Sequence, residues 1–316
     1  MRAGVLAGDA QVHIVEVPVP QPGPGEVRLR LEGCGVCGSD LPVWQGREWF
    51  HYPRPPGAPG HETWGYVDAV GPEVRGIAEG DRVAALSYRG YAEFDVARAD
   101  RVVRLGPELA GRPFPGEALG CAMNVFARSG IRAGDVVTVV GAGFLGSLLC
   151  QLAAAEGAEV IAIARRRAAR EAALAMGAAH ALDFAETTLE QVTQLSGGRL
   201  GDVVIEAAGA QATIDLAGAL TRVRGRLVIA GFHQDGPRQI DLQLWNWRGL
   251  DVINAHERDP ETYLDGIAAA ADAVGTGRLD PSPLYGTPFE LDRLGDALAA
   301  AAGVDEQRPA KAMVSP

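Results

Sequence analysis

The chain has 316 residues, of which 47% are hydrophobic, and a formal net charge of −11. This length and apolar content are sufficient for two domains with separate cores. The acidic balance argues against a nucleic-acid partner, which needs basic residues clustered on one face, and favours a small-molecule partner. No run of eighteen apolar residues occurs, and the first residues turn polar before a signal-peptide core is complete. We therefore expect no membrane span and a soluble, cytoplasmic protein.

The first hundred residues are rich in Gly, Pro and short runs in which apolar and polar residues alternate. Residues 26–31 (Glu-Val-Arg-Leu-Arg-Leu) and 101–105 (Arg-Val-Val-Arg-Leu) are two such runs. Alternation with turn residues between the runs is typical of strands that bury one face. This part of the chain is predicted to form a small β-rich domain.

The pattern changes near Gly134. Residues 136–140 form a continuous apolar run, and an apolar helix is expected over residues 145–156. Further strands are expected at 160–163, 203–205 and 227–230, with a long helix ending near residue 177. Strands that are apolar on both faces and alternate with helices indicate a parallel sheet covered by helices, the doubly wound α/β class. Residues 310–314 are predicted to form a final strand that returns to the first domain.

A glycine motif follows the apolar run at 136–140. Residues 141–146 read Gly-Ala-Gly-Phe-Leu-Gly, which places Gly141, Gly143 and Gly146 in a G-x-G-x-x-G pattern between a strand and a helix, with Phe144 and Leu145 inside it. In a dinucleotide-binding loop the first glycine makes the tight turn, the second lets the backbone approach the pyrophosphate, and the third lets helix and strand pack closely. The alternative is an ordinary glycine turn of an α/β protein.

Several side chains suit a metal ion. Cys37, His61 and Cys121 supply the three protein ligands that a catalytic zinc needs, with a fourth position open for substrate. Glu62, next to His61, is either a hydrogen-bond partner behind the ligands or an alternating ligand. Asp40 is suited to orient the His61 ring through its other nitrogen.

Five motifs follow one another along the chain. They are the runs 35–40 (Gly-Val-Cys-Gly-Ser-Asp), 60–62 (Gly-His-Glu), 80–83 (Gly-Asp-Arg-Val), 120–121 (Gly-Cys) and 141–146. With these motifs in this order the chain resembles, over essentially its whole length, the zinc-containing medium-chain dehydrogenase/reductase family, which includes alcohol, sorbitol and threonine dehydrogenases. The resemblance implies a GroES-like β-rich catalytic domain and a Rossmann domain.

The implied boundaries are residues 1–120 for the catalytic domain, completed by residues 254–316, and residues 121–253 for the Rossmann domain. The implied reaction transfers a hydride between a nicotinamide dinucleotide and an alcohol or polyol, or its carbonyl. The family further implies a homodimer or homotetramer, and residues 250–253 would suit a strand edge at which subunits pair.

The third zinc ligand stays open in the sequence. In polyol-type members the carboxylate equivalent to Glu117 contacts the water at the zinc, and the position of Cys121 is not a ligand. We favour Cys121 because thiolate binds zinc strongly, with Glu117 and Glu62 as alternatives. The four-cysteine lobe that holds a structural zinc in many members is missing, so we expect one zinc per chain. Cys34 forms a C-x-x-C pair with Cys37 that would also suit redox chemistry, but we interpret Cys34 as a core residue.

The resemblance also assigns the remaining catalytic and cofactor contacts. Ser39 matches the first member of the proton relay of alcohol dehydrogenases, whereas Pro42 replaces the histidine at its end; His51 or water would have to serve there. Cys37, Ser39, Asp40, His61 and Glu62 form the expected catalytic set. The nicotinamide is expected beside Ala230, Gly231 and Phe232, and Lys311 is expected to contact the cofactor.

The choice between NAD and NADP depends on the end of the second Rossmann strand. An NAD enzyme places an acidic residue there, which accepts hydrogen bonds from the ribose and repels a 2′-phosphate. This chain has Ala164, followed by Arg165, Arg166 and Arg167. We expect NADP to be preferred, because a guanidinium binds phosphate through paired hydrogen bonds; the alternative is that the arginines form a solvated helix face.

Two other functions remain open at this point. A zinc-free quinone or enone reductase would share the fold but lack the set Cys37, His61 and Cys121. A non-catalytic dinucleotide-binding protein would have no need of that set beside Ser39. Metal analysis and an assay over a broad panel of alcohols and aldehydes distinguish these functions from a zinc-dependent dehydrogenase.

Overall fold

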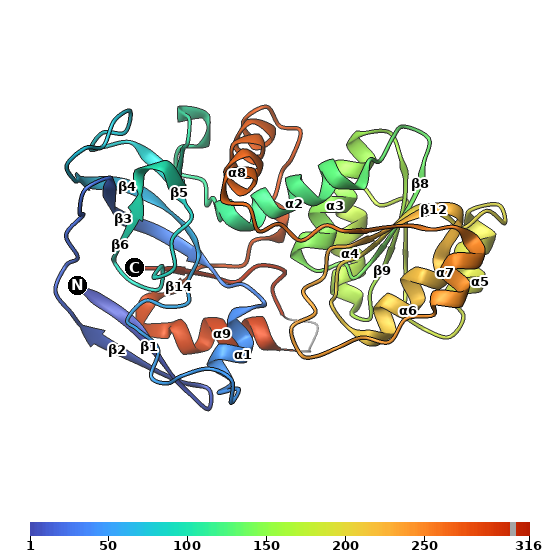
Figure 1. Cartoon of the computed structure of the whole chain (residues 1–316), viewed down its shortest axis with the longest axis horizontal. Coiled ribbons are helices and arrows are strands. Elements are labelled where there is room, and N and C mark those ends of the chain that lie inside the picture. The colour runs from blue at the N-terminus through green and yellow to red at the C-terminus, as the bar shows by residue number, and fades with distance from the viewer. Residues whose placement is uncertain (304–307) are drawn as a thin grey trace.

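Two lobes, each built on one large β-sheet, lie at opposite ends of the computed structural model, which describes residues 1–303 and 308–316 (Figure 1). One lobe contains a seven-stranded, mainly antiparallel sheet, and the other a six-stranded parallel sheet. Helices fill the space between the lobes and cover the parallel sheet on both faces (Figure 1). The predicted fold class, a β-rich domain joined to a doubly wound parallel sheet, is confirmed.

The β-rich lobe is formed mostly by the first hundred residues. Its large sheet has the order β14 (Phe289–Glu290), β15 (Met313–Ser315), β3 (Glu26–Gly35), β4 (Glu62–Val70), β5 (Arg82–Ala85) and β7 (Val102–Arg104), with β6 (Phe94–Arg98) paired to β3. A separate hairpin consists of β1 (Arg2–Gly8) and β2 (Gln11–Glu16). Alternate residues of β3, Val27, Leu29 and Leu31, are buried in the core of the sheet, as the alternating sequence predicts.

The C-terminal segment returns to this lobe. Strand β15 pairs antiparallel with β3, with Met313 opposite Gly35 and Val314 opposite Cys34. The strand predicted over residues 310–314 is therefore present, but it begins three residues later than predicted. Helix α9 (Leu294–Ala302) precedes it and packs near α1 (Asp40–Trp44) in one apolar cluster.

The parallel sheet has the order β10 (His180–Leu182), β9 (Glu159–Ile163), β8 (Val136–Val140), β11 (Gly201–Glu206), β12 (Thr221–Ile229) and β13 (Asp251–Asn254). All five residues of β8 are buried. Val137 and Val139 pack in the cluster of one sheet face, and Val136 and Val140 in the cluster of the other. A strand covered on both faces has no solvent side, which explains its continuous apolar run.

The helices divide between the two faces and the space between the lobes. Helices α3 (Phe144–Ala155) and α4 (Arg167–Ala175) contribute to one cluster, and α5 (Thr188–Leu195), α6 (Gln211–Leu220) and α7 (Leu242–Arg248) to the other. Helices α2 (Gly116–Ser129) and α8 (Pro260–Gly275) pack against each other between the lobes (Figure 1). The predicted boundary between residues 120 and 121 thus lies within α2. No helix in the described part of the chain has both the length and the apolar character needed to cross a membrane.

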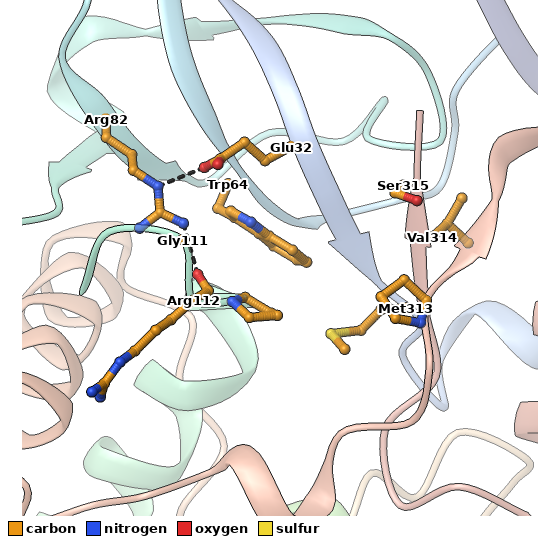
Figure 2. A pocket seen from close by; sticks show the side chains of 10 residues that line it. Glu32, Trp64, Arg82, Gly111, Arg112, Met313, Val314 and Ser315 are labelled. Atoms are coloured by element: carbon orange, nitrogen blue, oxygen red, sulfur yellow. Dashed lines mark hydrogen bonds and ion pairs between the residues drawn. The ribbon is translucent and has the colours of Figure 1, made fainter.

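The arginine of the Gly-Asp-Arg-Val run ties β5 to the segment that leads into α2. Arg82 is buried, and its Nε donates to Glu32 at 2.5 Å, while its two terminal nitrogens donate to the carbonyls of Leu109 and Arg112, both at 2.7 Å. Figure 2 shows the contacts of Arg82 with Glu32 and with the carbonyl of Arg112 beside Trp64, at the wall of a cavity of about 150 Å³. Because α2 carries Glu117 and Cys121, this contact fixes the start of a helix that faces the site described below.

We expect Arg82→Leu to lower the free energy of unfolding by about 2–4 kcal/mol, because the buried carbonyl of Leu109, the partly buried carbonyl of Arg112 and the partly buried carboxylate of Glu32 lose their donor. Chemical denaturation followed by circular dichroism measures the change. Arg98→Leu is the matched control, because the Arg98–Asp100 pair is exposed and its loss should leave stability nearly unchanged. Equal stability of the two variants would contradict a structural role for Arg82.

Candidate active site

The pairing of β3 with β4 brings the metal-suited side chains together. Cys37 lies two residues beyond β3, Glu62 begins β4, and Gly35 is paired opposite Glu62. As a result the ligand atoms of Cys37, His61 and Glu62 lie within 4.8 Å of one another. A Cβ at position 35 would overlap Oε2 of Glu62, so a larger residue there would have to displace the carboxylate that Lys311 holds.

Asp40 holds the His61 ring in place. The Nδ1 of His61 donates to the carbonyl of Pro59 at 2.9 Å and lies 3.4 Å from Oδ1 of Asp40. The other oxygen of Asp40 accepts from the backbone amide of Cys37 at 3.1 Å and from the hydroxyl of Tyr91 at 2.5 Å. Burial lowers the pKa of His61, but Asp40 and Cys37 outweigh it and raise this pKa well above its ordinary value. With Nδ1 engaged as a donor, Nε2 is the nitrogen left for a ligand.

Glu62 is neutralised by a lysine from the C-terminal segment. The Nζ of Lys311 donates to both carboxylate oxygens of Glu62, at 2.7 and 2.8 Å, and to the carbonyl of Val36 at 3.3 Å. The same nitrogen lies 4.6 Å above the ring of Phe144. Burial lowers the pKa of Lys311, but the charge of Glu62 outweighs it and raises this pKa. The structure thus places Lys311 in the cluster around Glu62, and contact of Lys311 with a cofactor stays a prediction.

Glu117 and Cys121 lie one turn apart on α2 and form a pair. The thiol of Cys121 donates to Oε1 of Glu117 at 3.3 Å. Burial raises the pKa of both groups, and the charge of His61 partly offsets this for Glu117. Glu117 lines the same cavity as His61. Neither Glu117 nor Cys121 belongs to the group of atoms within 4.8 Å of one another that Cys37, His61 and Glu62 form.

Cys34 is separate from this group, although it belongs to the C-x-x-C run. Its thiol donates to the carbonyl of Gly35 at 3.3 Å, and burial raises its pKa well above the ordinary value. All four cysteines are free. A buried thiol with a raised pKa is a poor nucleophile, which favours the interpretation of Cys34 as a core residue.

The hydroxyl of Ser39 is available for the hydrogen bonds that a proton relay would require. It is partly exposed, immediately before α1, and its hydroxyl has no hydrogen-bond partner among residues 1–303 and 308–316. Pro42 occupies the first turn of the same helix, and His51 is exposed in the following loop. No hydrogen bond in the described structure links Ser39 to His51, and a proton relay that begins at Ser39 stays a prediction.

A cavity of about 110 Å³ opens beside His61. Its walls come from the loop after β5, from α2 and from the start of α8: His61, Leu86, Ser87, Tyr88, Glu117, Arg258, Pro260 and Tyr263. The sequence motifs pointed to His61 and Glu117 alone among these. Tyr88, Arg258 and Tyr263, like the Asp40 partner Tyr91, belong to no motif, and only the packing of α8 against α2 brings the latter part of the chain to this wall.

The glycine loop has the geometry expected for a dinucleotide. Gly141 follows β8 with φ +107°, a conformation that favours glycine, and a Cβ at Gly146 would overlap the carbonyl of Gly141. A Cβ at Gly143 would meet nothing within 4 Å, so the backbone is open there. Helix α3 begins at Phe144, and Leu145 follows in its first turn. An open backbone at a helix N-terminus fits a pyrophosphate.

Positive charge gathers at the end of β9. Ala164 is buried, Arg165 is exposed, and Arg166 donates to the carbonyl of Arg308 at 3.1 Å. Burial and the charge of Arg166 lower the pKa of Arg308. The sequence did not point to Arg308, because 142 positions separate it from Arg166. No acidic residue occupies the position that a ribose-binding carboxylate would take.

The ends of β11 and β12 form the third part of the expected cofactor site. The amides of Ala230 and Gly231 both donate to the carbonyl of Glu206 at 2.8 Å. Phe232 is exposed and stacks on His256, with ring centroids 5.4 Å apart. These segments end at the same edge of the parallel sheet as the glycine loop, which is where such sheets bind ligands.

Comparisons with known proteins agree with this arrangement. Residues 23–122 match the model of the alcohol dehydrogenase GroES-like domain, and residues 145–272 match that of the zinc-binding dehydrogenase. A probable alcohol dehydrogenase of Mycobacterium tuberculosis is 30% identical, with 87% of each chain covered. A sorbitol dehydrogenase of Bacillus subtilis is 26% identical over 95% of this chain and 93% of its own. A quinone oxidoreductase of Sus scrofa is 28% identical over 86% and 83% of the two chains.

The fold also matches a solved structure along its whole length. A putative zinc-binding dehydrogenase from Sinorhizobium meliloti, bound to NADP, is 26% identical, with a TM-score of 0.87 and coverage of 100% of this chain and 99% of that one. Together with the family models and the named relatives, this similarity supports an oxidoreductase that uses a nicotinamide dinucleotide and a small-molecule alcohol. The chain belongs to the zinc-containing medium-chain dehydrogenase/reductase family.

Proposed function

We propose that the chain is a zinc-dependent dehydrogenase that oxidises an alcohol or polyol, or reduces its carbonyl, with NADP as the preferred cofactor. The observation that carries the proposal is the group Cys37, His61 and Glu62, whose ligand atoms lie within 4.8 Å of one another beside a cavity. Thiolate, imidazole and carboxylate are the donors that zinc prefers. The residues present therefore fit the metal.

Cys37 and His61 would hold the zinc, and the geometry favours Glu117 over Cys121 as the third protein group at the site. Glu117 shares the cavity with His61, whereas Cys121 donates its thiol proton to Glu117 from the adjacent turn. Glu62 is already neutralised by Lys311 and would act as a partner behind the ligands. Cys121 as a direct ligand, which the sequence favoured, remains the alternative.

The chain's own residues account for the rest of the chemistry. A zinc ion bound here would act as a Lewis acid and lower the pKa of the substrate hydroxyl. Ser39, whose hydroxyl has no partner in the described structure, accepts the proton of that hydroxyl and passes it outward. Asp40 keeps the His61 ring in one orientation. A nicotinamide held by the glycine loop and the ends of β11 and β12 would supply the acceptor for the hydride of the carbinol carbon.

The preference for NADP is supported by the cluster at the end of β9. Ala164 presents no carboxylate to repel a 2′-phosphate, Arg166 contacts Arg308 there, and Arg165 next to it in the chain is exposed. The related Sinorhizobium meliloti structure was solved with NADP bound. We propose that Arg165, the exposed member of the cluster, binds the 2′-phosphate.

Zinc content tests the proposed metal site. The purified protein should contain one zinc per chain, and Cys37→Ser should lose both zinc and turnover while keeping the circular dichroism spectrum of the wild type. Cys34→Ser is the matched control and should retain both, because the Cys34 thiol is bonded to the carbonyl of Gly35 and does not belong to the group. Active enzyme without zinc, or with two zinc ions per chain, would refute the proposal in favour of a zinc-free reductase or a second site.

Cofactor kinetics test the role of Arg165. Arg165→Ala should raise the Michaelis constant for NADP about tenfold and barely change that for NAD, because the lost interaction is with a phosphate that NAD lacks. Arg167→Ala, at an exposed position two residues further on that is paired with Glu171, should leave both constants unchanged. If the Arg165 variant weakens both cofactors equally, the arginines do not select NADP.

We also propose that the chain forms a homo-oligomer through the edge of the parallel sheet. Strand β13 is the edge strand, and apolar side chains are exposed around it: Val223, Ile240, Leu242, Trp247 and Val252, of which Trp247 is 87% exposed. Light scattering should therefore give a multiple of the chain mass. The double variant Trp247→Glu/Val252→Lys should give a monomer, whereas Leu174→Glu, on α4 near the opposite edge, should not. A monomeric wild type would contradict this assembly.

A further inference from the structure

The cavity beside His61 contains one cationic side chain that the proposed reaction does not use. Arg258 comes from the segment between β13 and α8 and is the only arginine or lysine among the residues that line the cavity. Its guanidinium forms no ion pair within 4.0 Å and no hydrogen bond with any residue in the ranges 1–303 and 308–316. A guanidinium without a partner at the wall of a substrate cavity is available to a ligand.

The acidic neighbours of Arg258 are engaged elsewhere. Glu257 accepts from the backbone amides of Arg258 and Asp259, at 2.7 and 2.8 Å. Asp259 caps α8, where its carboxylate accepts from the amide and hydroxyl of Thr262 at 3.2 and 2.7 Å. Both carboxylates are thus directed to the turn that begins α8. Neither carboxylate forms an ion pair with the guanidinium of Arg258, which lines the cavity.

A second guanidinium lies near the same wall. The carbonyl of Arg101 accepts from the amide of Leu86, which lines the cavity, at 2.9 Å. The pKa of Asp259 is lowered mainly by its hydrogen bonds from Thr262, and the nearby charge of Arg101 lowers it further. Nη1 of Arg101 is buried and has no hydrogen-bond partner in the described structure. Arg101 is paired with Asp100, Nε to Oδ1 at 3.7 Å, so among the described residues Arg258 is the guanidinium of this wall whose charge has no ion-pair partner.

We infer that the substrate of the proposed dehydrogenase carries an anionic group, a carboxylate or a phosphate, which Arg258 binds while the reacting hydroxyl lies near His61 and Cys37. The inference rests on the proposed function. The anionic group takes no part in the reaction: the carbinol C–H bond breaks, its hydride reduces the nicotinamide, and the hydroxyl proton leaves through Ser39. Arg258 sets the substrate class, because it binds an anion and gives a neutral polyol no comparable contact.

Matched substrate pairs test the inference. Lactate is compared with propane-1,2-diol, and glycerol 3-phosphate with glycerol, by kcat/KM with NADP. At least one anionic member should exceed its neutral partner about tenfold, mainly through KM, and the advantage should fall as salt rises because Arg258 is exposed. The pair that shows the advantage tells carboxylate from phosphate.

Variants separate Arg258 from general charge effects. Arg258→Gln should lower kcat/KM for the anionic substrate about tenfold more than for its neutral partner, and Arg258→Lys should restore part of the difference. Arg75→Gln is the control. Arg75 is exposed in the loop after β4, and Glu62 lies at the other end of that strand. It should leave all values unchanged. Equal turnover of charged and neutral partners, or equal losses in Arg258→Gln, would overturn the inference and leave the proposed function intact.

A binding measurement covers the case in which no substrate of the panel reacts, which would count against the proposed function itself. Titration calorimetry with propanoate and with methylphosphonate, inert anions of the two classes, should show binding to the wild type that Arg258→Gln loses. Propan-1-ol should not compete. Absence of anion binding to the wild type, or binding that Arg258→Gln retains, would overturn the inference independently of turnover.

Discussion

The register between β3 and β4 is the constraint on which the rest of the site depends. Gly35 faces Glu62 across this pair, so the chain that leaves β3 toward Cys37 meets the chain that enters β4 from His61. A shift by one residue would turn every side chain to the other face and separate the thiol from the imidazole. Strand β15 then joins the free edge of β3 beside the same residues. Lys311, two residues before β15, reaches Glu62 for this reason.

The site concentrates buried charge, and each charge has a partner. A buried carboxylate without a partner would be costly or would become protonated. Asp40 accepts from the Cys37 amide and the Tyr91 hydroxyl, and Glu62 is held by Lys311. The main effect of such a network is to hold its side chains in one arrangement, because none of them can move without leaving a charge unpaired. Its contribution to stability is smaller. Among the described residues, a thiol, an imidazole and a carboxylate converge at this place, in Cys37, His61 and Glu62, which is the arrangement that the proposed metal site uses.

Lys311 connects the glycine loop at residues 141–146 with the group Cys37, His61 and Glu62. Phe144 begins the helix after the glycine loop, lies beneath the ammonium of Lys311 and stacks on Tyr285, with ring centroids 6.1 Å apart. Lys311 in turn binds Glu62. A short chain of contacts therefore runs from the dinucleotide loop to the metal-suited group across the junction of the two lobes. Movement of one lobe against the other would change both ends together.

The sequence determined the elements and the chemistry of the motifs. Runs that are apolar on both faces predicted the strands of the parallel sheet, and alternation predicted β3, because the pattern reflects which faces each strand buries. The spacing of Gly141, Gly143 and Gly146 predicted a dinucleotide loop, since each backbone task there requires the absence of a Cβ. These features depend on local residues and on the elements that carry them.

Only the tertiary structure decided which distant residues share the site. Lys311 lies 249 positions from Glu62, and Arg308 lies 142 positions from Arg166; no local pattern records such pairs, because strand order and helix packing create them. The same holds for Tyr91 beside Asp40 and for Arg258 in the cavity wall. The sequence favoured Cys121 over Glu117 as the third zinc ligand. The packing of α2 places Glu117 at the cavity with His61, whereas Cys121 donates to Glu117. The sequence does not show which way a helical side chain points until the elements that pack against the helix are known.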